Sequence, residues 1–369
     1  MLDSAGLLIT AGNIRIIDFD VFSPSAKNFF EPPFCKGAYV KCVQFPNKAD
    51  SRAGIYKPKL TLIKQVVNGG YSINLKVEFS VPKLLFGNNF EELEEADFEA
   101  VLFKLQEILA EMGVLVEVET LKNAKICCVH FGKNVILAEA PSSLIINTIR
   151  KLNISKRLDA GNTDYRNDGQ AIRYHANSYE LTFYDKVKDL EQSKISEKRA
   201  IECDNELNFD FFSAAGLASK EVLRMEVRLN TARKLKEILA KVGCEVKSPT
   251  FNDVFDKGVA RGVLIHFWDS CIKPSLPAII LSEQSGQEIY HQAKNLGMND
   301  YRALQVVGAL NIIKGDTYRT LRNALSNHSY YRVKAEFDKF EQSDSYLCNS
   351  FKQIRKDLVE MQSLRFKET

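Results

Sequence analysis

The chain has 369 residues and lacks the extremes of composition that mark several classes of protein. Its 50 Lys and Arg residues barely exceed its 47 Asp and Glu residues, so the whole molecule does not carry the charge of a nucleic-acid-binding protein, and any basic surface must be local. No segment approaches the ~18 consecutive apolar residues of a membrane span, so we expect no membrane helix. The first residues contain neither a basic segment nor a long apolar core, and we therefore expect no signal peptide.

The eight cysteines form no CxxC pair and have no regular spacing. This pattern favours the reduced, mostly buried thiols of a cytoplasmic protein over a disulfide framework or a zinc site. The sequence also contains no Walker, GxSxG, HExxH or GxGxxG motif. None of the five histidines lies two residues from another, so the two-histidine metal motif of many single-strand nicking enzymes is absent.

The residues that are present indicate a folded protein of at least two domains. Hydrophobic residues make up 45% of the chain and charged residues 26%, as in globular proteins. Up to about residue 245, predicted strands alternate with single helices, which favours an α+β domain with a mainly antiparallel sheet and flanking helices. One hairpin is expected around Asn-Gly-Gly at 68–70, and an amphipathic helix is expected between Asp97 and Gly113. Residues 246–369 have helical periodicity and form a predicted helical C-terminal domain.

A second predicted hairpin covers residues 172–186, with a turn at 176–178. Side chains alternate along its second strand, so Tyr184 shares the polar face with Glu180 and Thr182, and Lys186 continues that face. A tyrosine and a lysine at the end of a strand suggest a nucleophile and its charge partner. The alternative is an ordinary sheet tyrosine with its hydroxyl in solvent.

Polar side chains also interrupt three other predicted strands, at Glu78, at His130 and at Glu226 between Arg224 and Arg228. Two carboxylates and an imidazole on one sheet face would suit Mg²⁺ or Mn²⁺. Each residue alone has a simpler explanation. A glutamate between arginines is typical of a solvated ion-pair ladder, and a lone histidine in an apolar strand is often a hydrogen-bonded core residue.

The C-terminal region contains a helix–turn–helix pattern. One amphipathic helix is predicted over 299–313, with Leu304 on its apolar face, and a second over 318–325, with Asp316 as the N-cap. A second helix of this kind can enter the major groove of double-stranded DNA. The alternative is an ordinary helical bundle. The basic residues that would contact DNA are Arg319, Arg322, Arg332 and Lys334, the last two beside a pair of tyrosines.

Several segments together resemble the replication initiators of filamentous phages and related plasmids, the gene II/X-type family. The resemblance covers most of the chain, and its segments occur in the family's order. They are LKVEFSVPKLLFGNNFEEL (75–93), ICCVHFGKN (126–134), YELTFYDK (179–186), FFSAAGLASKEVLRMEVRLN (211–230) and MNDYRALQVVGALNIIKGDTYRTLRNALSNHSYYR (298–332). One departure is that His130 is a single histidine where the wider nicking-enzyme superfamily has two.

The resemblance implies a rolling-circle nicking enzyme that works with a host helicase and polymerase. Such proteins cut one strand of an origin, stay attached to its 5′ end through a phosphotyrosine, leave a 3′ hydroxyl and later rejoin the strand. Alternatives are a relaxase or transposase with the same chemistry, or a non-catalytic origin-binding regulator. The implied roles are nucleophile for Tyr184, phosphate-neighbouring cation for Lys186, phosphate contacts for Arg224 and Arg228, and a Mg²⁺ or Mn²⁺ site at Glu78, His130 and Glu226.

Overall fold

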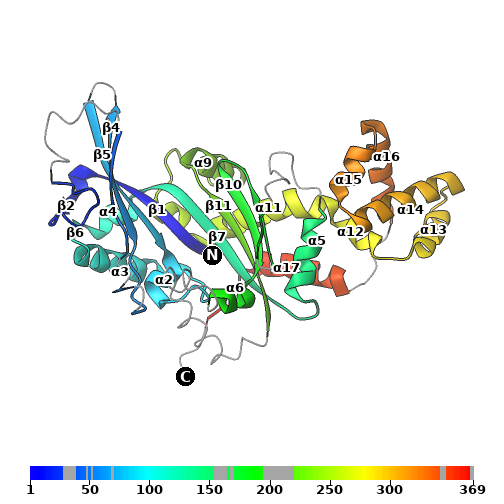
Figure 1. Ribbon diagram of the computed structural model, residues 1–369, viewed down its shortest axis with the longest axis horizontal. Coiled ribbons are helices and arrows are strands. Elements are labelled where there is room, and N and C mark those ends of the chain that lie inside the picture. The colour runs from blue at the N-terminus through cyan, green and yellow to red at the C-terminus, as the bar shows by residue number, and fades with distance from the viewer. Residues whose placement is uncertain are drawn as a thin grey trace.

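The computed structural model describes residues 1–27, 39–46, 49–50, 53–67, 70–152, 164–166, 170–193, 220–340 and 346–365. It contains one large antiparallel sheet with helices packed on it and a group of helices at the far end of the molecule (Figure 1). The predicted class, α+β with a helical C-terminal region, is confirmed. No helix within the described ranges is long and apolar enough to cross a membrane.

Nine strands of the described chain form the large sheet, and every neighbouring pair in it is antiparallel. The strand at its centre, β7, is 13 residues long and lies between the strand that begins the chain and one that begins after residue 220. In spatial order the strands are β3 (Tyr39–Gln44), β4 (Lys59–Val67), β5 (Gly70–Ser80), β1 (Leu2–Thr10), β7 (Lys125–Leu137), β11 (Glu221–Leu229), β10 (Tyr179–Asp185), β9 (Ala171–His175) and β8 (Asp164–Arg166). A small second sheet pairs β2 (Ile14–Ile16) with β6 (Val114–Val116).

Both predicted hairpins are confirmed by strand pairing, because β4 pairs with β5 and β9 pairs with β10. Residues 68 and 69 of the first turn lie outside the described part of the chain. The predicted alternation in the second hairpin also holds, since Leu181 and Phe183 are fully buried on the core face. Strand β7 continues past Gly132 to Leu137, because the Gly132 backbone has a partner on each side: β11 on one side and Met1 on the other.

Helices cover the core face of the sheet. Phe251 on α10 packs edge-on against Phe79 of β5, with ring centroids 5.8 Å apart, and Gln353 on α17 donates a hydrogen bond to the Ile136 carbonyl of β7. In the part of the chain that the structure describes, the α-helices before α12 with defined bounds are α2 (Val81–Phe86), α3 (Phe98–Glu111), α4 (Val118–Lys122), α5 (Ser142–Arg150), α6 (Lys186–Ser193), α9 (Ala232–Lys241), α10 (Phe251–Val254) and α11 (Lys257–Phe267), which continues as a π-helical turn at Trp268–Ile272. The predicted helix between Asp97 and Gly113 is therefore confirmed.

The remaining helices divide into two sets. Helix α17 (Tyr346–Glu360) packs on the sheet beside α11, whereas α12 to α16 pack on one another at the end of the molecule (Figure 1). Their bounds are α12 (Leu276–Ser282), α13 (Gly286–Asn295), α14 (Asp300–Gly315), α15 (Tyr318–Ala324) and α16 (Asn327–Phe337). Helices α10 and α11 also contact the sheet, and the domain division at residue 245 stays a prediction.

Two details of the predicted helix–turn–helix are wrong. The side chain of Thr317, not Asp316, accepts the N-capping hydrogen bond of α15, from the Thr320 backbone. Leu304 is 61% exposed, because the residues that the first turns of α14 bury are Ala303 and Val306. Successive residues differ by about 100° around a helix, so a shift of one residue turns a side chain from the core to solvent.

Candidate metal centre and the neighbouring tyrosine

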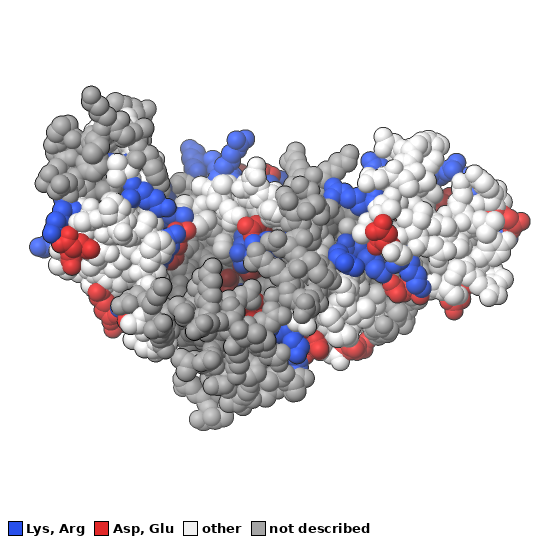
Figure 2. Space-filling view, viewed as in Figure 1, with Lys and Arg blue, Asp and Glu red and all other residues white. Residues whose placement is uncertain are grey.

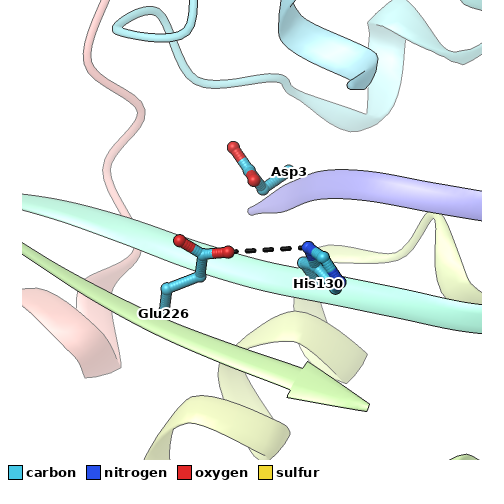
Figure 3. Close-up of side chains that lie close together, drawn as sticks. All are labelled: Asp3, His130 and Glu226. Carbon is cyan, nitrogen blue, oxygen red and sulfur yellow. Dashed lines mark ion pairs between the residues drawn. The ribbon is translucent and has the colours of Figure 1, made fainter. Parts of the chain in front are cut away.

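Three side chains from three neighbouring strands converge on one face of the sheet: Asp3 of β1, His130 of β7 and Glu226 of β11 (Figure 3). Their ligand-type atoms all lie within 4.8 Å of one another. The dashed line in Figure 3 marks the ion pair between His130 Nδ1 and Glu226 Oε1, which lie 3.5 Å apart. Two carboxylates and one imidazole favour a hard or borderline divalent ion such as Mg²⁺ or Mn²⁺.

A β-bulge in β1 brings Asp3 into this cluster. Leu2 is paired with Phe131 and Ser4 with His130, so Asp3 is an extra residue with no partner of its own on β7. Leu2 and Ala5 on either side are buried in the core, which leaves both Asp3 and Ser4 to face the cluster. Regular alternation would have turned one of them to the other face. The adjacent polar pair between two apolar residues was the sequence signal for this bulge.

Glu78 is not a member of the cluster in the described part of the chain, so the sequence-based metal set is corrected to one that contains Asp3. Strand β1 lies between β5 and β7, and Glu78 is placed opposite Gly6 of that intervening strand. Its carboxylate forms ion pairs with Lys76 at 2.7 Å and with Lys59 at 3.3 Å. The prediction assumed that β5 and β7 were neighbours.

Arg224 forms an ion pair with Asp3 that fixes the position of the Asp3 carboxylate. The guanidinium also donates a hydrogen bond of 2.9 Å to Asn134 Oδ1. Gly132 makes room for this guanidinium, because a Cβ there would lie 2.7 Å from Arg224 Nη2. Arg224 is only 3% exposed. It was expected to contact phosphate, but its structural position is that of a buried partner for Asp3.

Electrostatics keep two of the three groups in the protonation state that a metal requires. Burial raises the pKa of Asp3, but Arg224, followed by His130 and Lys186, outweighs it and leaves the pKa below its ordinary value. Burial lowers the pKa of His130, which keeps its imidazole neutral at pH 7 despite the nearby carboxylate of Glu226. At neutral pH Asp3 is therefore an ionised carboxylate and His130 a neutral imidazole, and these two ligands fit a divalent ion.

Glu226 is buried and contacts both His130 and an arginine. Arg228 donates a hydrogen bond of 2.8 Å to Glu226 Oε1, and its guanidinium lies 3.8 Å from Glu180 Oε2. The expected ladder of alternating charges thus exists on the Arg228 side, whereas Arg224 turns to Asp3 instead. Arg228 stays partly exposed at the rim, where it can reach a ligand outside the sheet.

Tyr184 lies on β10, the strand next to Glu226 of β11, and is paired with Arg224 in the strand register. Burial raises the pKa of Tyr184 well above its ordinary value; Arg224 opposes this effect and Glu226 adds to it. The phenol therefore stays protonated at neutral pH, and it needs a base before it can act as a nucleophile.

Lys186, whose amine lies over the Tyr184 ring, is a candidate for that base. It is the first residue of α6, is 1% exposed, and places Nζ 5.2 Å from the Phe90 ring centroid and 5.6 Å from that of Tyr184. Burial, with help from Arg224, lowers the pKa of Lys186 to about 8. Asp185 starts the helix at this point by accepting backbone hydrogen bonds from residues 187 and 188.

The basic residues predicted to contact double-stranded DNA lie in the distant helical group (Figure 1). The guanidinium of Arg322 stacks on Tyr330, 4.4 Å from its ring centroid, and also faces Tyr331 at 5.3 Å. Arg332 is exposed and donates a hydrogen bond to Gln305, while Arg319 and Lys334 are half-buried.

Basic side chains, with acidic ones among them, lie where this helical group meets the end of α5. Figure 2 shows Lys and Arg side chains gathered over α5, α12 and α15. Lys151 forms an ion pair with Glu283, and Lys314 donates a hydrogen bond to the carbonyl of Glu283, so segments far apart in sequence meet here. The Tyr318 backbone also donates to the Lys151 carbonyl at 2.8 Å.

No protein-family model, curated protein or solved structure matches the chain. The function is therefore inferred from the geometry and chemistry of the site.

Proposed function

We propose that the protein is a metal-dependent endonuclease and strand transferase that starts rolling-circle DNA replication on a nicking-enzyme-like fold. The observation that carries the proposal is that Tyr184 lies on the strand next to a metal-type cluster on the same sheet face. Asp3, His130 and Glu226 are the residues that would hold the metal. A relaxase or transposase with the same chemistry shares this site.

In the proposed reaction, Oη of Tyr184 attacks the phosphorus of a DNA phosphodiester. The Oη–P bond forms, the bond from phosphorus to the 3′ oxygen breaks, and the strand remains as a 5′-phosphotyrosine. The phenol proton passes to the neutral amine of Lys186, and the departing 3′ oxygen takes up a proton from solvent water. The reverse attack by a 3′ hydroxyl rejoins the strand, because the phosphodiester energy is kept in the tyrosyl bond.

A bound divalent ion would polarise the scissile phosphate and stabilise the charge that develops on it, an effect worth several kcal/mol. Arg224 keeps the Asp3 carboxylate ionised and oriented. Arg228, at the partly exposed rim, is placed to contact a flanking phosphate. Because Lys186 is buried, its role in this proposal is that of a base, in place of the phosphate-neighbouring cation that the resemblance implied.

The proposal is tested by incubating the full chain with 5′- and 3′-labelled single-stranded oligonucleotides of diverse sequence, with Mn²⁺ and with a chelator. We expect an SDS-resistant adduct that carries the label on the 3′ side of the cut, only when metal is present. A free 5′ phosphate with no adduct would contradict the tyrosyl mechanism.

The cluster in the structure contains Asp3, whereas the set predicted from the sequence contains Glu78, and substitutions can distinguish the two. His130→Ala and Asp3→Asn should each raise the Mn²⁺ concentration for half-maximal adduct formation, by roughly tenfold or more. Glu78→Ala is the matched control, an acidic residue on the same sheet that lies outside the cluster, and it should leave the metal requirement unchanged. A larger effect of Glu78→Ala than of Asp3→Asn would contradict the assignment.

The low pKa of Lys186 gives a pH dependence. Below pH 8 its amine is protonated and cannot accept the phenol proton, so the single-turnover rate should rise about tenfold per pH unit and level off above about pH 8. Lys186→Arg keeps the charge but loses the base, so the rise should disappear together with most of the rate. Lys188→Arg, an exposed neighbour on α6, should keep the wild-type profile. An unchanged profile in Lys186→Arg would remove the base role.

A non-catalytic DNA-binding regulator on the same fold is the second candidate. It is favoured by the ion pairs of Asp3 with Arg224 and of Glu226 with Arg228, which balance both carboxylates without a metal. The two candidates differ in metal binding. A nicking enzyme should gain stability with Mn²⁺, by about 2.7 kcal/mol at a hundred times the dissociation constant, whereas the regulator should show no shift.

We further propose that double-stranded DNA binds the helical group and the adjoining basic side chains. Arg319→Ala and Arg332→Ala should each weaken binding to duplex DNA and reduce the salt slope of the binding constant by about 1, as expected for phosphate contacts. Arg322 would act differently, because its stacking fixes Tyr330 and Tyr331. Arg261→Ala, an exposed arginine of α11, is the control. Unchanged affinity and salt slope in both variants would make this region a scaffold.

A further inference from the structure

A second β-bulge in the central sheet places two adjacent cysteines on the same face. Gly6 of β1 is paired with Cys128 and Leu7 with Ile126, so Cys127 is an extra residue in β7. Adjacent residues of a regular strand point to opposite faces. Here Ile126 and Val129 are buried in the core on either side, and both thiols lie on the polar face.

Because Gly6 has no side chain, there is room beside it for both sulfur atoms. A Cβ at Gly6 would lie 2.4 Å from the Sγ of Cys128 and 3.0 Å from the Sγ of Cys127, so both thiols lie over the same point of β1. Cys127 also donates a hydrogen bond of 3.2 Å to the Gly6 carbonyl. A residue with any side chain at position 6 would push the thiols apart, whereas glycine lets them share one site.

We propose that Cys127 and Cys128 form a dithiol site that binds one soft, thiophilic centre, such as trivalent arsenic or monovalent copper, through two sulfur ligands. Thiolates select soft centres, in contrast to the oxygen and imidazole ligands of the cluster at His130. Both cysteines are half-buried, so the site is accessible from solvent.

The geometry favours a bridging ligand over an internal disulfide. The Cα atoms of adjacent residues are about 3.8 Å apart, shorter than the roughly 4.4–6.8 Å found across ordinary disulfides, so direct closure would strain the bulge. A centre that sits between the sulfurs removes the need for them to meet. With phenylarsine oxide the step is balanced without oxidation: two S–H bonds and the As=O bond break, two As–S bonds form, and one water leaves.

The test uses phenylarsine oxide with the reduced, full-length protein in excess glutathione, read by intact mass. We expect one equivalent to bind, with a mass gain equal to the arsenical less one water, and to be released by a competing small dithiol. Cys127→Ser and Cys128→Ser should each weaken binding, on the order of a hundredfold, because a single thiol loses the chelate advantage. Cys244→Ser, which removes another half-buried thiol, should bind as the wild type does.

Melting curves of each variant show whether it is folded, and Gly6→Ala supplies an independent check. Its new methyl group should displace the Cys128 thiol and weaken arsenical binding while both cysteines remain. Failure of the wild type to retain the arsenical in glutathione would overturn the proposal. Retention by the folded Cys127→Ser and Cys128→Ser variants would overturn it too. So would rapid loss of both thiols to a disulfide under mild peroxide, since it would show that the pair closes on itself.

Discussion

Tyr184→Phe should abolish the covalent DNA adduct and leave single-stranded DNA binding nearly unchanged. The substitution removes only the hydroxyl, and no other oxygen at that position can form the ester. Loss of a covalent nucleophile typically costs on the order of 10³-fold or more in rate. The measurement is single-turnover adduct formation with saturating Mn²⁺, beside binding measured with a chelator.

Two tyrosines of the same hairpin serve as controls. Tyr179 stacks near Phe267, with ring centroids 5.5 Å apart, and Tyr174 donates a hydrogen bond of 2.9 Å to the Ile149 carbonyl. Tyr179→Phe should form the adduct at the wild-type rate. Tyr174→Phe should lose only some stability, because it leaves the Ile149 carbonyl without that donor. An adduct that persists in Tyr184→Phe and disappears in either control would show that another tyrosine is the nucleophile.

The elements that the sequence predicted well are those whose signals are local. Turn residues at 68–70 and 176–178, together with alternating side chains, were enough to predict both hairpins. The helix α3 followed from apolar residues at three- and four-residue spacing and from Gly113, whose φ of 80° suits glycine at the end of a helix. In α14 the same method wrongly placed Leu304 on the buried face. Its neighbour Ala303 is also apolar, and packing against the other helices determines that Ala303 is the buried one.

The site was only partly predictable, because strand order and bulges are set by contacts between distant residues. Alternation placed Glu226 and Tyr184 on the polar face correctly. It could not show that β1 enters the sheet between β5 and β7, which replaces Glu78 by Asp3. Nor could it show that the two bulges turn Asp3 and Cys127 to the polar face, since a bulge breaks the very pattern from which faces are assigned.

Loss of Arg224 from its ion pair with the largely buried Asp3 should have a large effect on stability. Arg224→Met removes the partner of a buried carboxylate, and such changes cost about 3–5 kcal/mol of unfolding free energy, because the remaining charge is left uncompensated. Denaturant unfolding can be followed by the fluorescence of Trp268, the single tryptophan of the chain. Its ring lies 6.5 Å from that of Phe183 on β10, so it reports on the sheet.

Removing both members of the pair should restore most of the loss. In Arg224→Met with Asp3→Leu no buried charge is left alone, and apolar replacements of a buried pair are often neutral or stabilising. Arg355→Ala is the surface control, because Arg355 and Asp269 are both substantially exposed and such pairs contribute about 0–1 kcal/mol. If Arg224→Met costs no more than Arg355→Ala, the guanidinium is not needed to compensate Asp3. If the double variant is as unstable as Arg224→Met, the cost comes from lost packing around Gly132, where the guanidinium fills the space above the glycine.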